Sequence, residues 1–437
     1  MAGVVKRDLP NGVTLLVREQ HGAPLVAIDA WVRAGSGVEE EDESGCAHFL
    51  EHLLFKGTAT RKTGEIDAAI EDLGATLGAG TTRDGAHYYT TVASAYYKNA
   101  LEVIGDALQN SVIDPAELER ERSVIMDEMA RARNDVLKQA TNKLFSELLP
   151  GQRYGRAVLG DPESLKALTR DKVFAFYRKW YIPQNLTLVL VGDLTPDQAE
   201  EAANAVFGKW PSGKSPSPDK ISIPAAKAAD AKPLTLTSPA VPAGKQSVYS
   251  AYLIEPSTDF TASTTAKLAV TLLGDIEIGR IAKSIRDSEG LAATPSTNRN
   301  TRASSTPPPP VAVSGDFVYL TGPTLAILTA QTSTGRPDTV QKLIQDSVER
   351  LRHEAPTADE MDMARRRILG PYLYDIETYA GQARMLGIYA MLGDYTLAQR
   401  YAEIVNSIKV ADVTAFAQKS FVAERQANLI LSPGAKQ

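Results

Sequence analysis

Apolar residues near the start of the chain form short runs bounded by turn signals, a pattern typical of strands. The turn dipeptide Asn11-Gly12 precedes the runs 13–17 and 25–32, which predicts a strand, a turn and a strand. Ser44 is a residue type that favours helix N-caps, and a helix is predicted from there to about Gly57. The same patterns predict further helices at 64–73, 97–109, 170–180 and 197–207, and strands at 75–79, 87–93 and 186–193.

A long helical segment is predicted in the middle of the first half. Asp114-Pro115 is a helix-start signal, with proline at the first helical position. From there the sequence is rich in Glu, Arg, Ala and Leu, and we expect helix to about Leu149.

The composition changes at residues 211–231, where four prolines accompany several serines and lysines and an alanine-rich stretch. Such a stretch is typical of a linker between domains. After it the order of elements partly repeats, with a strand at 247–254, helices at 261–273 and 279–289, strands within 311–329, a helix at 338–353 and a late helix pair within 358–420. We therefore predict an α+β protein with domains at 1–212 and 232–437 and a linker at 213–231.

Composition and charge exclude several classes of protein. The 437 residues carry a net charge of -6, so no basic face for nucleic acid is expected. No apolar run approaches the roughly 18 residues of a membrane span. The single cysteine, Cys46, excludes an intrachain disulfide and a cysteine-rich zinc cluster. The start of the chain lacks an apolar signal region. Because the chain starts almost directly at its first predicted strand, we expect a soluble protein of the bacterial periplasm, with the cytoplasm as the alternative.

The sharpest chemical signal is His48-Phe49-Leu50-Glu51-His52. Residues four apart on a helix share a face, so both imidazoles can reach one metal ion. Zinc sites that hydrolyse amides commonly use two His and one Glu, and a further glutamate takes the proton of the water. The alternative is a surface helix with two solvated histidines. The order His-x-x-Glu-His is a known motif class of zinc peptidases.

A third protein ligand has to come from another element, and the acidic candidates lie on the helix that begins at Asp114. They are Glu117, Glu119, Glu121, Asp127 and Glu128. Glu121 and Glu128 are seven residues apart and line one face, so one could bind the metal while the other supports the site. Periodicity alone does not choose between them, and solvated helix charges are the alternative.

The segment Ala47 to Thr58 closely resembles the pitrilysin/insulinase family of zinc metallopeptidases, the inverzincin type. The similarity is strongest to half-size subunits of the mitochondrial processing peptidase-like branch. Supporting segments are Leu9 to Gly12, Ala34 to Ser36, Glu121 to Glu128, Tyr181 to Asn185 and Gly192-Asp193. The resemblance implies two homologous α/β-sandwich domains, each a mostly antiparallel sheet packed by helices, that form a clamshell dimer.

The resemblance also implies a role for each site residue. His48, His52 and Glu128 would bind one zinc ion per chain, Glu51 would be the general base, and Glu121 would support the site from behind. Leu77, Gly78 and Ala79 stand where relatives hold the substrate with Leu-Asn-Ala, so glycine replaces the asparagine. Extended peptides are expected to add to the edge of a sheet there.

A second departure lies in the other half. Relatives carry an arginine and, seven residues later, a tyrosine that reach the substrate. Arg286 fits the first position and would bind substrate, but Ala293 stands at the second and cannot donate a hydrogen bond. A surface arginine is the alternative for Arg286. We therefore expect a heterodimer in which a homologous zinc-less chain supplies the Arg/Tyr pair, with a homodimer as the alternative.

The sequence thus predicts a zinc-dependent endopeptidase of the HxxEH type that hydrolyses peptides or unfolded segments. The chain would be the active subunit and would need a homologous partner to complete the site. The alternative function is a non-catalytic or weakly active zinc-containing, peptide-binding subunit of a larger complex.

Overall fold

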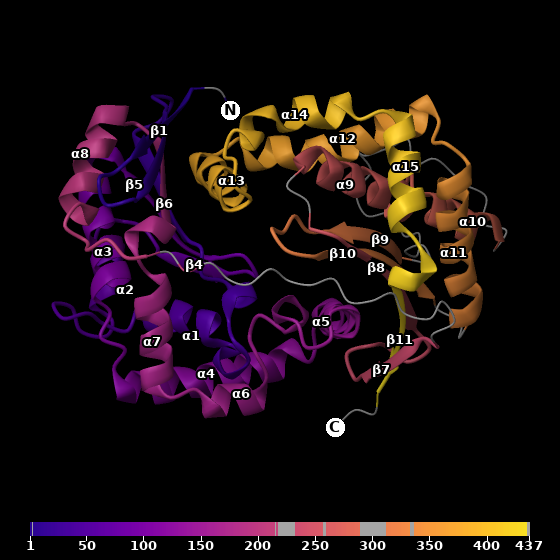
Figure 1. The fold of residues 1–437 in the computed structure, drawn as a ribbon, viewed down its shortest axis with the longest axis horizontal. Helices are drawn as coiled ribbons and strands as arrows, with labels where there is room; N and C mark the ends of the chain where they lie inside the picture. Colours follow the sequence, from indigo (N-terminus) through magenta and orange to yellow (C-terminus); the bar gives the residue numbers. More distant parts are fainter. Residues whose placement is uncertain are drawn as a thin grey trace, which may run out of the picture.

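A computed structural model describes residues 1, 3–214, 216, 232–256, 259–288, 312–332 and 336–434. The molecule has two halves, each a β-sheet with helices on its outer side, and the two sheets face one another across the middle (Figure 1). The predicted fold class, two α/β domains with mostly antiparallel sheets, is confirmed. The predicted linker, 213–231, falls almost wholly outside the described residues, so its bounds and those of the two domains stay predictions.

The first sheet has the strand order β1-β2-β6-β3-β5-β4. Its strands are β1 (Val4–Asp8), β2 (Thr14–Glu19), β3 (Leu25–Val32), β4 (Gly78–Thr81), β5 (Ala86–Ala93) and β6 (Leu186–Gly192). Strands β2 and β6 are parallel and the other neighbours are antiparallel. Strand β4 is therefore an edge strand, which leaves one side of its backbone without a strand partner in this sheet.

The second sheet has the order β7-β11-β8-β10-β9. Its strands are β7 (Leu234–Ser238), β8 (Gln246–Ile254), β9 (Ala312–Phe317), β10 (Thr324–Thr332) and β11 (Gln426–Pro433). Only the β7–β11 pair is parallel among these neighbours. Each strand of the second sheet thus has a counterpart in the first sheet, in the same order and direction, and only β1 of the first sheet has none. This repeat of topology supports the prediction that the two domains are homologous.

The helices of the first half are α1 (Cys46–Leu53), α2 (Glu65–Glu71), α3 (Tyr97–Asn110), α4 (Pro115–Ala132), α5 (Val136–Leu148), α6 (Pro162–Ala167), α7 (Arg170–Trp180) and α8 (Pro196–Phe207). The prediction of a single long helix from Asp114 to Leu149 is wrong, because the helix is interrupted between Ala132 and Val136. Asp135 starts the new helix, since its carboxylate accepts the backbone N–H of Lys138.

The helices of the second half are α9 (Phe260–Gly274), α10 (Arg280–Ser288), α11 (Pro337–His353), α12 (Ala358–Asp375), α13 (Tyr379–Met391), α14 (Leu397–Ser407) and α15 (Val410–Ser420). The region 358–420 holds four helices instead of the predicted pair. None of the helices in the described ranges is both long and apolar enough to cross a membrane.

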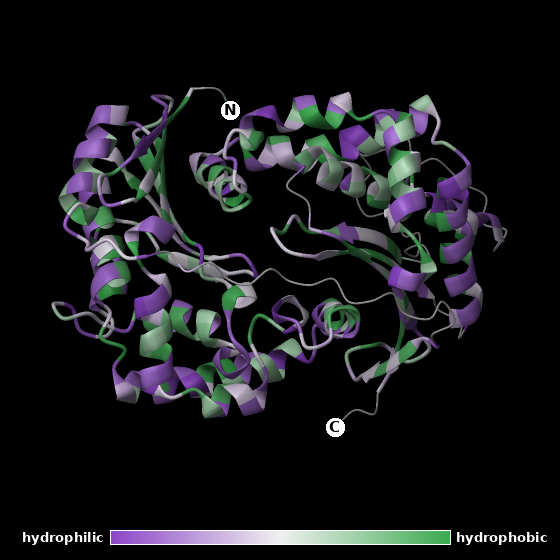
Figure 2. Ribbon diagram, viewed as in Figure 1, coloured by the Kyte–Doolittle hydropathy of each residue, from purple (hydrophilic) through white to green (hydrophobic). Residues whose placement is uncertain are grey.

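One helix from each half packs on the sheet of the other half. Helix α13 packs on β3 and β6 of the first sheet, where Gly387 lies against the indole of Trp31. Helix α5 packs on β11 and β8 of the second sheet through an apolar cluster that includes Leu144 and Tyr249. Hydrophobic residues gather in the strands of both sheets and in these two central helices (Figure 2). This exchange joins the halves through buried apolar surface, which is the main source of cohesion between packed elements.

Candidate metal centre and active site

Helix α1 carries the His-x-x-Glu-His segment and is held on two sides. Its apolar face, which includes Phe49, Leu50 and Leu53, is fully buried in the first core. The helix packs against α4 and against the edge strand β4. The predicted N-cap, Ser44, is wrong by one residue, because Gly45 is the N-cap, in the left-handed conformation that glycine adopts at little cost.

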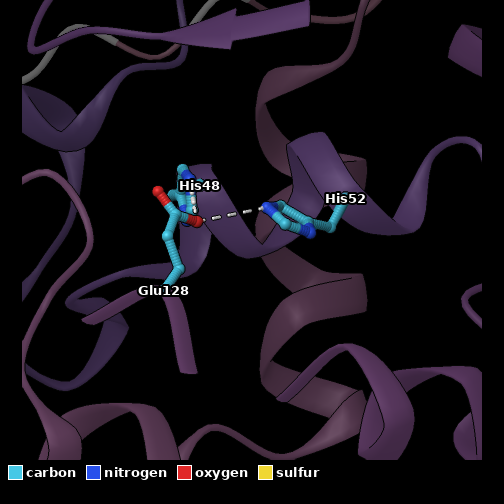
Figure 3. A group of neighbouring side chains, drawn as sticks. All are labelled: His48, His52 and Glu128. Atoms are coloured by element: carbon cyan, nitrogen blue, oxygen red, sulfur yellow. Dashed lines mark ion pairs between the residues drawn. The ribbon is translucent and has the colours of Figure 1, made fainter. Parts of the chain in front are cut away.

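His48, His52 and Glu128 come together between α1 and α4. One carboxylate oxygen of Glu128 lies 3.6 Å from Nε2 of His48 and 3.8 Å from Nε2 of His52. Figure 3 shows this oxygen between the two imidazole rings. One ligand atom from each residue lies within 4.8 Å of the others, so the three side chains form a group that could hold a metal ion. Four-coordinate zinc with bonds of about 2.0–2.2 Å keeps its ligand atoms roughly 3.4 Å apart. The two distances from Glu128, 3.6 and 3.8 Å, are close to that spacing.

The protonation state of His48 also fits a metal ligand. Burial, with smaller effects from the charges of His52 and Lys138, lowers the pKa of His48 to about 3. The imidazole is therefore neutral at physiological pH, which is the form that binds a metal.

Glu121 lies behind this group. Its carboxylate is 2.9 Å from Nδ1 of His52 and 3.1 Å from Nζ of Lys56. A carboxylate on the far nitrogen of a metal-binding histidine fixes the ring and the tautomer, so that Nε2 is free to bind. The geometry thus favours Glu128 as the ligand and Glu121 as the supporting residue, the choice that the spacing had left open.

Glu51 lies beside the group and is held by the neighbouring strand. The hydroxyl of Thr81 donates a hydrogen bond of 2.5 Å to Oε2 of Glu51. Burial raises the pKa of the Glu51 carboxyl, while the bond from Thr81 and the charge of His52 oppose that rise. Thr81 was missed from the sequence. The alternation of side chains in a strand could have found it, because Thr81 lies two residues after Ala79 and so shares its face.

Comparison with known proteins identifies the family. The family model described as Insulinase (Peptidase family M16) matches residues 14–162, and the one described as Peptidase M16 inactive domain matches residues 167–368. The chain belongs to peptidase family M16. The resemblance seen in the sequence to the pitrilysin/insulinase family is therefore confirmed.

Individual relatives of this M16 chain agree with that assignment. Mitochondrial-processing peptidase subunit beta of Blastocladiella emersonii is 31% identical over 205 residues, which are 47% of this chain and 44% of that protein. The match thus spans less than half the length of this curated relative. A protease from Helicobacter pylori has the same fold, with a TM-score of 0.84, 19% identity and 99% of both chains covered. A peptidase M16 inactive domain from Pseudomonas fluorescens matches with a TM-score of 0.82, 21% identity, and 100% of this chain and 99% of that chain covered.

In this M16 chain an aromatic ring explains the glycine at position 78. Gly78 pairs with Tyr89 across the β4–β5 ladder, and a Cβ added to Gly78 would lie 2.5 Å from the Tyr89 ring. The ring stacks on His87, which stacks in turn on Trp31. Leu77, Gly78 and Ala79 thus lie at or beside the edge strand, as expected, but the tyrosine ring fills the space that a side chain at 78 needs. A role of these three residues in substrate binding stays a prediction.

We expect that Gly78→Asn alone costs about 1 kcal/mol of unfolding free energy, below the usual range for core overpacking, because the Tyr89 side chain is 42% exposed. The asparagine would have to displace the Tyr89 ring. In a Gly78→Asn/Tyr89→Ala double variant the clash is removed, so the two costs should not add. Urea unfolding of the four proteins of this cycle measures the coupling. Purely additive costs would show that Tyr89 does not determine the residue at 78.

Arg286 is on α10, on the outer side of the second half and away from α1 (Figure 1). Its guanidinium donates to the backbone carbonyls of Ile276 and Glu277 at 3.1 and 3.2 Å. The structure therefore does not bring Arg286 to the metal group, and a substrate role for it stays a prediction. Ala293 lies outside the described residues.

Glu39 has a buried carboxyl that the sequence analysis did not single out, because it is one of several acidic residues before Ser44. Its two oxygens accept the backbone N–H groups of Gly45 and Ala47 at 3.0 and 2.8 Å, at the start of α1. Burial raises the pKa of Glu39 to about 8, although these two bonds and the charge of Arg156 oppose the rise. Glu39 thus anchors the end of the helix that carries His48.

The free energy of unfolding should fall as the pH rises from 4.5 towards 8. In that window the folded chain keeps a proton on Glu39, with a pKa of about 8, while the unfolded chain, with a pKa of 4.5, has lost it. Glu39→Gln should flatten this pH dependence. It should also cost about 1–3 kcal/mol, because an amide NH₂ cannot accept the second backbone N–H. Urea unfolding across the window checks both effects, and an equally steep slope in the variant would contradict the assignment.

Proposed function

We propose that this chain is a zinc-dependent endopeptidase that hydrolyses peptides or unfolded segments. The observation that carries the proposal is the convergence of His48, His52 and Glu128 on one point, with Glu51 held beside it by Thr81. Two histidines and a glutamate are a ligand set of catalytic zinc sites, which keep one position open for water. Bound zinc supplies two things: it lowers the pKa of a water, and it polarises the substrate carbonyl.

Proton transfer and the positioning of the reacting groups are assigned to residues of the chain. Glu51 accepts the proton of the attacking water and passes it to the leaving amine. Thr81 holds the carboxylate of Glu51 in position through its 2.5 Å hydrogen bond. Glu121 orients the ring of His52, and Lys56 in turn balances the charge of Glu121.

The substrate is proposed to be an extended peptide that pairs with the free edge of β4. This strand is at the sheet edge and packs against α1, so a peptide paired with it would pass close to Glu51. Edge pairing reads the backbone and needs an unfolded segment, which excludes compact folded domains as substrates.

We further propose that a homologous chain completes the active site. The relative from Blastocladiella emersonii is named as a subunit, which is consistent with action in an assembly. A zinc-less partner supplying the Arg/Tyr pair is the favoured arrangement, and a homodimer is the alternative. The purified chain should then cleave peptides more slowly than a two-chain mixture. Equal rates would refute the need for a partner.

The central test is cleavage of an unstructured peptide in the presence of zinc. Cleavage should stop on addition of a chelator and return when zinc is restored in excess. Cleavage that survives complete removal of the metal would overturn the proposal. The same assay tests the second candidate function, a peptide-binding subunit with little turnover. That candidate is favoured by Gly78, which has no side-chain donor and whose side-chain space is occupied by the Tyr89 ring. That subunit would bind the peptide and zinc without measurable cleavage.

A further inference from the structure

A cavity of about 200 Å³ opens at the C-terminal end of α4, the helix that carries Glu128, between that end, the start of α5 and residues 157–162. Met129, the residue directly after Glu128, forms one wall, and Lys138, Asn142 and Leu159 are among the other lining residues. Whole small-molecule pockets have volumes of roughly 300–1,000 Å³, so this cavity fits a single side chain rather than a separate ligand.

Lys138 brings positive charge into this cavity. Its side chain is half-buried, and it lines the cavity together with Met129, the neighbour of Glu128 in the sequence. Arg133, the residue after α4, lines the same cavity. Within the described parts of the chain, neither Lys138 nor Arg133 has a carboxylate within ion-pair distance. Two cations thus face a cavity at the end of the helix that carries Glu128, without an anionic partner from those residues.

The acidic side chain that lines the cavity, Asp161, is the N-cap of α6 (Pro162–Ala167). Asp161 lines the cavity, but one of its oxygens accepts the backbone N–H groups of Glu163 and Ser164 at the start of α6. Gln139, another lining residue, donates its amide to the backbone carbonyl of Arg133. The amide of Asn142 lines the cavity as a neutral hydrogen-bonding group.

A second cavity of about 380 Å³ adjoins the first and extends the same charge pattern. The two share Asn142, Ala157, Gly160 and Asp161 as lining residues. The second cavity adds Lys143 and Arg156 to its walls. Cations therefore outnumber carboxylates along the whole groove, which favours an anionic side chain over a basic one.

We propose that the cavity at Lys138 and Arg133 is a substrate subsite that binds an acidic side chain of the peptide near the bond to be cleaved. The inference rests on the proposed function, because it assumes that a peptide lies at the metal group. The chemistry that it selects is a carboxylate of Asp or Glu, paired with the ammonium of Lys138 and reached also by the guanidinium of Arg133. Peptides with a basic residue at that position would be rejected by like-charge repulsion.

Binding can be tested separately from cleavage. The probe is a set of short unstructured fluorescent peptides that differ only in having Glu, Gln or Lys at one position, which is scanned along the peptide. Full-length Glu51→Gln protein loaded with zinc binds them without turnover, and fluorescence anisotropy gives the dissociation constants. At one position of the scan, the Glu peptide should bind about tenfold more tightly than the Gln peptide, with the Lys peptide weakest, and added salt should reduce the difference.

Charge reversal supplies the matched control. Lys138→Glu in the same background should invert the order, so that the Lys peptide binds best. Arg131→Glu makes the same charge change at an exposed position of α4 that lines neither cavity, and it should keep the order. Lys138→Met, with thermal unfolding measured for each variant, covers the case in which Lys138→Glu does not fold, and it should abolish the preference.

Equal binding of the three peptides at every position, or an unchanged order in Lys138→Glu and Lys138→Met, would overturn the subsite. The failure of the proposed function looks different. In that case the acidic preference and its inversion would appear in binding, while the zinc-loaded wild-type chain cleaved none of the peptides.

Discussion

Glu51→Gln should lower the rate of peptide hydrolysis by about 10²–10⁴-fold, the usual contribution of a general base, while zinc stays bound. Glutamine has the shape of glutamate, and its amide oxygen can still accept the hydrogen bond from Thr81. What it lacks is the capacity to take a proton from water. Glu51 is not part of the ligand group formed by His48, His52 and Glu128, so the affinity for zinc should change little.

The measurement combines turnover of the unstructured peptide with the zinc content of the purified proteins. Glu71→Gln is a matched control, because Glu71 is an exposed glutamate at the end of α2 and the same atoms change there. The control should keep full activity and full zinc. A Glu51→Gln protein that binds zinc and retains near wild-type turnover would remove Glu51 from the role of base.

The parts of the site that could be predicted from the sequence are those fixed by local geometry. Four residues separate His48 from His52, and any helix brings such a pair to one face. The turn at Asn11-Gly12 and the helix start at Pro115 likewise depend on a few adjacent residues. The two-domain organisation followed from the repeated order of elements, and both sheets have the matching topology.

The parts that the sequence did not reveal depend on contacts between distant segments. Thr81 reaches Glu51 across 30 positions, and the Glu39 carboxyl is buried under α1 by the fold. The break at Asp135 was missed because the helix-forming residues on both sides dominated the prediction, although Asn134 and Asp135 are poor helix formers and good N-cap residues. The choice between Glu121 and Glu128 required the packing of α4 on α1, since both glutamates lie on one face of α4.

Substitution of these two glutamates should separate their roles. Glu128→Gln removes a charged ligand from the metal group, so zinc binding and peptide hydrolysis should both be lost. Zinc should raise the melting temperature of the wild-type chain, because it binds only the folded state, and should leave that of Glu128→Gln unchanged. Calorimetric titration and thermal unfolding with and without zinc measure both effects.

Glu121→Gln should have a milder effect on the same measurements. It removes the anion that orients His52, and it leaves the ammonium of Lys56 close to that ring without its partner. Loss of such a supporting carboxylate typically weakens metal affinity by about 10–100-fold, so excess zinc should restore most of the hydrolysis. If Glu121→Gln lost zinc altogether while Glu128→Gln retained it, the two roles would be reversed. The carboxylate of Glu121 would then be the metal ligand. Its 2.9 Å contact with Nδ1 of His52 would be the arrangement that these two side chains adopt when no metal is bound.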